Sequence, residues 1–171
     1  GCTSLESVTI GNGVKTIYNS AFNGCINLST VKFGSGLETI DSYAFYNCDS
    51  LENITLPSNT ETINNHAFLD CDGLKNISLN GKLKTIGKGA FNSCYSLEKI
   101  VIPDSVTNIY SEDYDYYKRQ TFGNCKNLKT VVIGSGLGYI DEAMFKGCTS
   151  LESVTIGNGV KTIYNSAFNG C

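Results

Sequence analysis

The sequence contains few of the residues on which catalysis, metal binding and nucleic-acid binding depend. It has one histidine, His66, and no Cys-x-x-Cys pair, so the usual ligand sets for zinc are missing. A catalytic base needs an oriented partner, and His66 occupies a variable position of the repeat described below, where we expect a surface side chain. Lysine and arginine are scattered singly, which argues against nucleic-acid binding. We therefore predict no enzymatic activity, no metal or other cofactor, and no nucleic-acid partner.

Long apolar runs are missing as well. No segment approaches the roughly 20 consecutive apolar residues that a membrane-spanning helix needs, so we predict no membrane span. The chain has 41% hydrophobic residues and a net charge of −3, which is typical of a soluble, folded domain. It has neither an initiating methionine nor a signal peptide, and we expect it to be part of a longer protein.

What the sequence has instead is a repeat that its cysteines mark. Their successive spacings are 23, 23, 23, 23, 31, 23 and 23 residues. A phenylalanine lies three residues before every cysteine but the first, and a leucine lies three residues after every cysteine but the last. Such self-similarity indicates a stack of one structural unit, and we predict a single solenoid domain of seven units over residues 1–171. The marking cysteines are Cys2, Cys25, Cys48, Cys71, Cys94, Cys125, Cys148 and Cys171.

Each unit consists of an expected strand, a turn and a corner. The strand is a short alternation such as Val8 to Ile10, and period-2 alternation of β-branched residues indicates a strand. Glycine, proline, asparagine or serine follows, as in turns. One unit cannot bury its apolar face alone, so units must stack in parallel register around a continuous core. We predict a leucine-rich-repeat solenoid with a parallel β-sheet, about one short strand per 23-residue coil and little helix, about 34 Å long.

The combined pattern resembles a known repeat family. It is C-x-x-L-x-x-[VI]-x-[ILF]-x-x-x-[VL]-x-x-I-x-x-x-A-F-x-x-C, and it is similar to the BspA-type leucine-rich repeat of bacterial and protist surface proteins over essentially the whole chain. The departures are Thr60 in place of an apolar residue, Thr121 and Met144 in place of alanine, and one unit that is eight residues longer. The resemblance implies a secreted or cell-surface protein that serves adhesion or macromolecular contact.

The cysteines allow two interpretations. Equivalent Cα atoms on stacked coils would lie about 4.8 Å apart, within the range of a disulfide. Equivalent side chains point in parallel, however, which makes the disulfide dihedral angle hard to satisfy. A free buried cysteine packs as a small hydrophobic residue. We favour a reduced structural ladder in the core, in which case the cysteine count says little about redox compartment.

The extra eight residues of the fifth unit lie within residues 110–120. Insertions in repeat proteins often form binding loops, and tyrosine suits recognition because it offers a large contact area at low entropic cost. The alternatives are a solvated loop whose tyrosines pack on the coil and a calcium site, for which three carboxylates are few. The candidate binding residues are Tyr110, Glu112, Asp113, Tyr114, Asp115, Tyr116 and Tyr117.

The first 25 residues return unchanged at the end of the chain, because residues 1–25 and 147–171 are identical. Either a longer array repeats every 146 residues, or one end has been engineered to resemble the other. Natural solenoid ends carry polar or atypical caps, whereas these units are ordinary, so we expect uncapped ends with exposed strand edges. Copies are then expected to stack head to tail, an open interface that gives filaments.

Two functions are compatible with the sequence. In the first, the protein is a non-enzymatic extracellular segment that forms a fibrous or surface structure, with itself as partner. In the second, it is an adhesin-like module that contacts a host or matrix protein or a glycan through the strand face and the Tyr-rich loop. The hydroxyl-rich strand face can accept weak hydrogen bonds, but serine and threonine also simply suit solvated strands. The repeated end favours the first function, and the insertion favours the second. A third possible function is that of a scaffold for an enzyme domain outside this segment.

Overall fold

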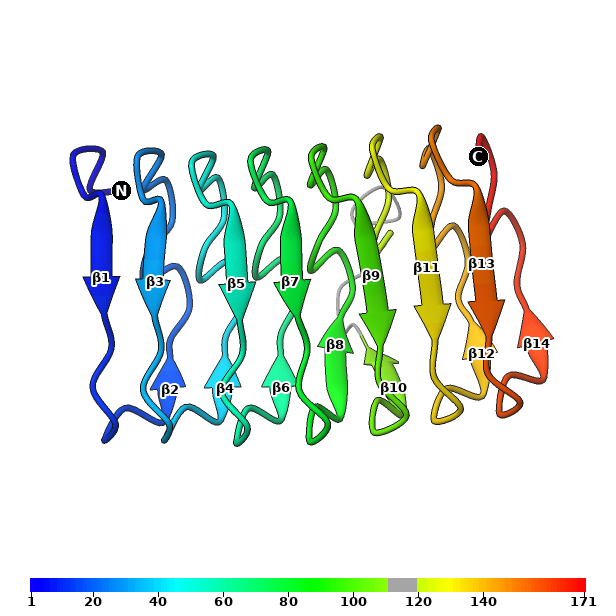
Figure 1. The fold of residues 1–171 in the computed structure, drawn as a ribbon, viewed down its shortest axis with the longest axis horizontal. Helices are drawn as coiled ribbons and strands as arrows, with labels where there is room; N and C mark the ends of the chain where they lie inside the picture. The colour runs from blue at the N-terminus through cyan, green and yellow to red at the C-terminus, as the bar shows by residue number, and fades with distance from the viewer. Residues whose placement is uncertain (111–119) are drawn as a thin grey trace.

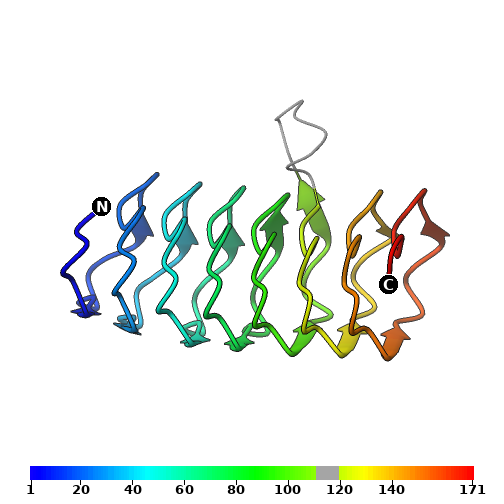
Figure 2. The same cartoon turned by 90° about the horizontal axis from the view of Figure 1, so that it is seen from above.

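The structure is a computed structural model that describes residues 1–110 and 120–171, with the backbone alone at Tyr110. Over these ranges the chain winds into stacked coils with short strands and no helix (Figure 1). The two termini lie at opposite ends of an elongated stack (Figure 2). We number a coil from each cysteine: coils 1 to 7 are residues 2–24, 25–47, 48–70, 71–93, 94–124, 125–147 and 148–170.

Each coil contributes one front strand and one back strand, which is shorter in every coil except coil 4, so the prediction of a parallel β-solenoid is confirmed. The second strand is an addition: the apolar residue expected to lead into the corner pairs with its neighbours in a back ladder. The front strands are β1 (Ser7–Thr9), β3 (Thr30–Lys32), β5 (Asn53–Thr55), β7 (Asn76–Ser78), β9 (Lys99–Ile102), β11 (Thr130–Ile133) and β13 (Ser153–Ile156). The back strands are β2 (Thr16–Ile17), β4 (Thr39–Ile40), β6 (Thr62–Ile63), β8 (Thr85–Gly87), β10 (Asn108–Tyr110), β12 (Tyr139–Ile140) and β14 (Thr162–Ile163).

Strand pairing keeps equivalent residues of neighbouring coils side by side. Val8 of β1 pairs with Val31 of β3, and the longer fifth coil keeps the same register, with Ile100 of β9 opposite Val131 of β11. The back strands from β2 to β10 form one sheet, and β12 pairs with β14 separately. The front strands divide into β1–β3, β5–β7 and β9–β11–β13. The front sheet is therefore interrupted twice, between β3 and β5 and between β7 and β9.

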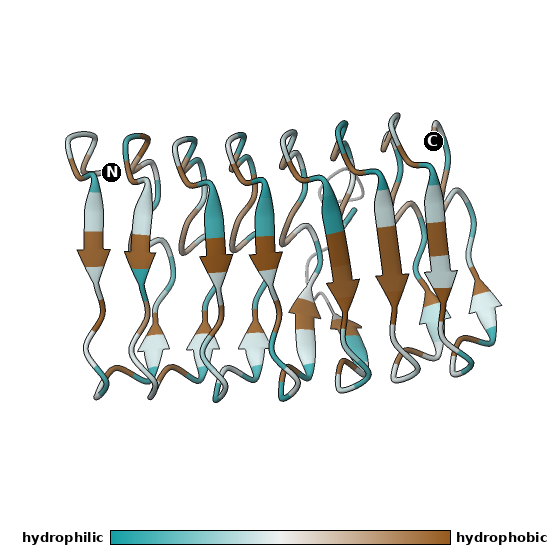
Figure 3. Ribbon diagram, in the orientation of Figure 1, coloured by the Kyte–Doolittle hydropathy of each residue, from teal (hydrophilic) through white to brown (hydrophobic). Residues whose placement is uncertain are grey.

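The core consists of ladders of identical side chains that run the length of the stack. In β1, β3, β5 and β7 an apolar centre lies between polar neighbours, whereas β9 and β11 are apolar over most of their length (Figure 3). The inward residues are almost all buried. The phenylalanines form a continuous stack, with ring centroids 5.2–5.4 Å apart and interplanar angles of 4–9°. These distances lie in the favourable range for offset aromatic contacts. The stacked rings are Phe22, Phe45, Phe68, Phe91, Phe122, Phe145 and Phe168.

The corner before each Ala-Phe pair requires a left-handed backbone, and this corner holds His66 in coil 3. His66 has φ of 59° and Tyr43, at the same position in coil 2, has φ of 57°. The two rings stack with centroids 4.9 Å apart, and His66 is only 2% exposed. The expectation of a surface histidine is therefore wrong, because the aromatic residue of the neighbouring coil covers the side chain.

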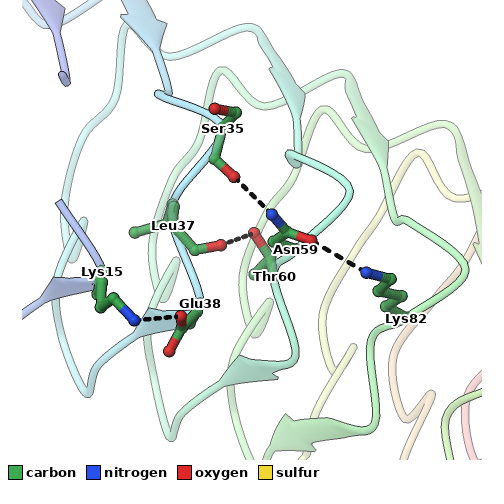
Figure 4. Close-up of polar contacts among 7 residues, drawn as sticks. All are labelled: Lys15, Ser35, Leu37, Glu38, Asn59, Thr60 and Lys82. Carbon is green, nitrogen blue, oxygen red and sulfur yellow. Dashed lines mark hydrogen bonds and ion pairs between the residues drawn. The ribbon is translucent and has the colours of Figure 1, made fainter. Parts of the chain in front are cut away.

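Thr60, which departs from the apolar consensus, is fully buried. Its hydroxyl oxygen lies 3.1 Å from the carbonyl oxygen of Leu37 in the preceding coil and donates a hydrogen bond to it (Figure 4). A buried hydroxyl needs such a partner, so the departure is accommodated without an unsatisfied polar group. The neighbouring Asn59 bridges the coils on both sides, donating to the carbonyl of Ser35 and accepting from Lys82 (Figure 4).

Candidate contact surfaces

The cysteine ladder belongs to the core over most of its length. Its members are free thiols, buried in coils 2 to 7 and exposed at Cys2 and Cys171. From Cys48 on, each thiol donates a hydrogen bond to the carbonyl oxygen of the phenylalanine 26 residues earlier, or 34 residues earlier across the long coil. The sulfur of Cys71, for example, lies 3.0 Å from the carbonyl oxygen of Phe45. Each thiol, at the start of its coil, thus bonds to the corner that ends the coil two earlier, as Cys71 of coil 4 does to Phe45 of coil 2.

Burial favours the protonated form of the thiols of Cys48, Cys71 and Cys125 by raising the pKa of each. It raises the pKa of the Cys48 thiol to about 12 and that of Cys71 and Cys125 well above the ordinary value. Only the thiolate is a good nucleophile or metal ligand. The chemistry of the ladder is therefore that of small apolar side chains with one directed hydrogen bond.

Most of the sequence-predicted binding loop lies outside the described residues. This applies to Glu112, Asp113, Tyr114, Asp115, Tyr116 and Tyr117, and of Tyr110 only the backbone is described, pairing with Gly87 at the end of β10. Next to this position the structure shows a contact that the sequence pattern did not indicate. Lys88 of coil 4 and Asp141 of coil 6 form an ion pair, 2.8 Å between Nζ and Oδ2, and each side chain is only 20% exposed. Coils 4 and 6 are thus linked directly past coil 5.

The front face has a hollow where the sheet is broken between β7 and β9. It has a volume of about 290 Å³, and its lining includes Asn76 and Ser78 from β7 and Lys99 and Val101 from β9. Val101 is 46% exposed. An amide, a hydroxyl, an ammonium group and an apolar side chain thus surround one depression. Sequence reasoning identified the hydroxyl-rich strand face but not this position on it, because the break depends on strand pairing.

Charged side chains pair along the outside of the stack with a spacing of one coil. Lys15 and Glu38 lie 2.9 Å apart, and Lys84 and Glu61 lie 2.7 Å apart. The hydrogen bond from Lys84 lowers the pKa of Glu61. These groups are well exposed, so each pair stabilises the fold only weakly.

The outer face of coil 7 exposes positions that are covered elsewhere in the stack. Ile163 of β14 is 54% exposed, whereas Ile17, the same residue of the identical segment in coil 1, is 4% exposed because coil 2 covers it. Ile156 is also exposed on this coil, whereas its counterparts Ile102 and Ile133 in coils 5 and 6 are buried. The far end of the described stack is therefore an apolar surface with strand edges.

Neither a metal site nor a membrane-spanning helix is found in the described parts of the chain, residues 1–110 and 120–171. No group of histidine, cysteine or acidic side chains there is placed to hold a metal ion. No helix there has the length and apolar content to cross a membrane.

Comparison with solved structures shows the same architecture in bacterial repeat proteins. The leucine-rich repeat protein of T. pallidum superposes with a TM-score of 0.83 at 28% identity, covering 93% of this chain and 73% of that one. A leucine-rich repeat protein from Bacteroides ovatus gives 0.70 at 30% identity, covering 97% and 46%. A leucine-rich cell surface protein from Faecalibacterium prausnitzii gives 0.67 at 22% identity, covering 92% and 49%.

The chain thus spans less than half the length of two of these three proteins. No curated protein matches it by sequence. The model of the BspA type leucine-rich repeat region matches in six copies, over residues 1–120 and 110–171. Repeat period, ladder residues, fold and family model agree, and the chain belongs to the BspA-type leucine-rich-repeat family.

Proposed function

We propose that this chain is a non-enzymatic segment of an extracellular or cell-surface protein that builds an extended structure by continuing the solenoid from one copy to the next. The observation that carries the proposal is the regular stacking of the coils, in which an apolar residue such as Ile17 is 4% exposed because the next coil covers it. Family membership supports the location, because BspA-type repeats are typical of surface proteins. The leucine-rich cell surface protein of similar fold agrees with that location.

Coil stacking is the interaction that the whole molecule already uses. Within the described residues, neighbouring coils bond to each other through their backbones, as in the bond from the Glu38 nitrogen to the Lys15 carbonyl, 2.8 Å. An exposed strand edge templates pairing with another chain, so the same contacts can join two copies. A contact between the tail of one copy and the head of the next is heterologous and does not close, so it gives linear assemblies.

Sedimentation velocity over a range of protein concentrations, followed by electron microscopy, tests this function. We expect the mass to rise with concentration and the particles to be unbranched rods whose width is that of one solenoid. Ile163→Asp should keep the chain monomeric, because a carboxylate at the tail cannot be buried without a partner. A single-chain mass at every concentration for the unmodified protein would refute the proposal.

A second candidate function is contact with a host or matrix protein or a glycan through the front face. The hollow between β7 and β9 favours it, because Asn76, Ser78 and Lys99 present polar groups beside the exposed apolar Val101. Concave sites with a few convergent polar groups are the usual form of binding sites. This function and self-association are compatible, since the hollow lies on the side of the stack and not at its end.

Binding to arrayed glycans and purified matrix proteins tests the second candidate. Lys99→Glu should reduce any binding at least tenfold. Lys32→Glu is the matched control, because Lys32 is also an exposed front-strand lysine, on β3 and outside the hollow. Equal loss in both variants would assign the binding to general charge and not to the hollow.

A further inference from the structure

The step between β7 and β9 lacks a backbone hydrogen bond that closes other steps of the front sheet. Between β5 and β7, for example, the Leu56 nitrogen donates to the carbonyl oxygen of Ser78, 3.1 Å away. The equivalent atoms of the next step are the Leu79 nitrogen and the Val101 carbonyl oxygen, and no backbone bond joins them in the described structure. Both residues line the hollow, so a backbone donor and a backbone acceptor lie beside it without their usual strand partner.

The hollow is polar at one end and apolar at the other. Asn76 and Lys99 are the first residues of β7 and β9, whereas Leu79 and the outward side chain of Val101 lie towards the other end of these strands. Strand β9 accordingly changes from hydrophilic to hydrophobic along its length (Figure 3). The largely buried Ile77 is also part of the lining. A ligand that fits the hollow must therefore be amphipathic.

Lys99 supplies a positive charge that is not paired within the described residues. The lysines that form ion pairs there are Lys15, Lys75, Lys84 and Lys88. Among the outward residues of the seven described front strands, the charged side chains are Lys32 and Lys99. The front strands thus present cations and no anion, and a carboxylate is the ligand group that complements Lys99.

Val101 supplies the apolar contact, and its distance from Lys99 sets the spacing of the two ligand groups. Val101 is 46% exposed and lies in register with Val132 of β11, so two valines are neighbours on the face. Residues two apart on a strand point to the same side, about 6.6 Å apart. An extended peptide has the same period. Its acidic side chain can therefore contact Lys99 while an aliphatic side chain two positions away contacts Val101.

We propose that the hollow between β7 and β9 binds an extended segment of a partner protein in which an acidic residue lies two positions from valine, isoleucine or leucine. The carboxylate binds Lys99 and the amide of Asn76, and the aliphatic side chain packs on Val101 and Leu79. The backbone nitrogen of Leu79 is available to donate to a peptide carbonyl. The inference rests on the second candidate function, contact through the front face, and names the class of partner.

A peptide suits this lining better than a sugar chain does. Three of the lining residues, Ile77, Leu79 and Val101, are aliphatic, and none of the described lining residues is aromatic. Sugar hydroxyl groups would find few partners against aliphatic side chains, and a polar group buried without a hydrogen bond costs free energy. An aliphatic side chain gains free energy there because it leaves water.

The step between β3 and β5 provides an internal comparison. The front sheet is open there as well, and β3 presents the exposed Lys32. The outward residue beside it on β5 is Thr55, which is polar where β9 has Val101. This step has a cation and an opening but no exposed aliphatic side chain, so we expect the peptide to bind at β9 and not here.

A titration with a synthetic peptide, followed by the NMR shifts of the backbone amides, tests the inference. The probe has blocked ends and the sequence Ser-Thr-Glu-Thr-Val-Thr-Ser. We expect shifts at Leu79, Lys99 and Val101 and none at Thr55. The isomer Ser-Thr-Glu-Val-Thr-Thr-Ser is the matched control, because its glutamate and valine point to opposite sides of an extended chain. The isomer should bind about tenfold more weakly.

Variants of exposed residues locate the site without disturbing the core. Lys99→Glu should weaken binding of the probe about tenfold and should favour a second probe that carries lysine in place of glutamate. Val101→Thr keeps a β-branched residue on the strand and should weaken binding severalfold, because it makes β9 resemble β5 at this position. Lys32→Glu is the control for general charge and should leave binding unchanged.

The outcomes separate the inference from the function on which it rests. Equal binding of the two isomers, or equal loss in Lys99→Glu and Lys32→Glu, would overturn the inference. If the probe shifts no amide of the hollow but a glycan or a matrix protein binds and Lys99→Glu weakens that binding, the peptide partner is wrong while contact through the front face stands. If no probe, glycan or matrix protein binds, both proposals are wrong.

Discussion

Lys88 and Asp141 form an ion pair of 2.8 Å although a complete coil lies between theirs. Each side chain is 20% exposed, so solvent screens the pair less than an ordinary surface pair. Both residues lie at the corner where coil 5 carries its eight-residue insertion. The pair therefore holds coils 4 and 6 together at the one irregular step of the stack.

We predict a coupling energy of about 1 kcal/mol between these two side chains. The measurement is a double-mutant cycle of urea unfolding with Lys88→Met, Asp141→Asn and the double variant. The cycle of Lys15→Met and Glu38→Gln is the matched control, because those side chains are 72% and 50% exposed and should couple by only a few tenths of a kcal/mol. Equal coupling in the two cycles would contradict a special role for Lys88 and Asp141.

The thiols should fall into two classes of reactivity. With a thiol reagent at about pH 8, where thiolate is the reacting form, Cys2 and Cys171 should react in the native protein because they are exposed. The six cysteines from Cys25 to Cys148 are buried and should react only after unfolding. The check is the number of labelled thiols by mass spectrometry before and after denaturation. Rapid labelling of Cys71 in the native protein would contradict the prediction, because it would show that the reagent reaches the buried thiols without unfolding.

Stability should fall at alkaline pH. Burial raises the pKa of Cys48 from 9.0 to about 12 and that of Cys71 well above the same starting value, so above pH 9 the folded chain binds more protons than the unfolded chain. The stabilisation is complete below about pH 9 and is lost as pH rises towards the folded-state pKa, by at most about 1.4 kcal/mol per pH unit for each thiol. Urea unfolding between about pH 8 and pH 11 measures it.

The control for the pH dependence is Cys71→Ser, which keeps a hydrogen-bond donor near the carbonyl of Phe45 but does not ionise in this range. Its stability should decline less steeply with pH than that of the unmodified protein. Tyrosine and lysine titration is common to both proteins and cancels in the comparison. Identical slopes would mean that Cys71 does not contribute.

Gly13 and Gly159, which are equivalent residues of the two identical segments, should differ in their tolerance of alanine. A methyl group on Gly13 would meet open space, whereas a Cβ on its identical counterpart Gly159 would overlap the carbonyl oxygen of Ser135. Gly13→Ala should change stability by less than about 0.5 kcal/mol, and Gly159→Ala should cost about 1–3 kcal/mol in coil 7. Hydrogen exchange of the peptides that cover residues 153–163 measures the second effect. Equal protection in both variants would contradict the close approach of coils 6 and 7.

The ladders were predictable because they depend on period alone. The cysteine spacing places Cys71 beside Cys48 and Phe68 beside Phe45 in any parallel stack. The back strands were not predicted as strands, because runs such as Thr16–Ile17 are too short to show an alternation. The burial of His66 and the ion pair of Lys88 depend on which side chain a neighbouring coil happens to provide, and no repeat pattern contains that information.

The two identical end segments separate what the sequence determines from what the tertiary structure determines. The sequence by itself determined the coil: the same 25 residues form the same strand, turn and corner at both ends, because local alternation and turn residues act within one unit. Only the tertiary structure decided whether the apolar side of each segment is buried. Ile17 is 4% exposed and Ile163 is 54% exposed, because a coil buries its apolar face only against a neighbour, and coil 2 covers the first segment while nothing described covers the second.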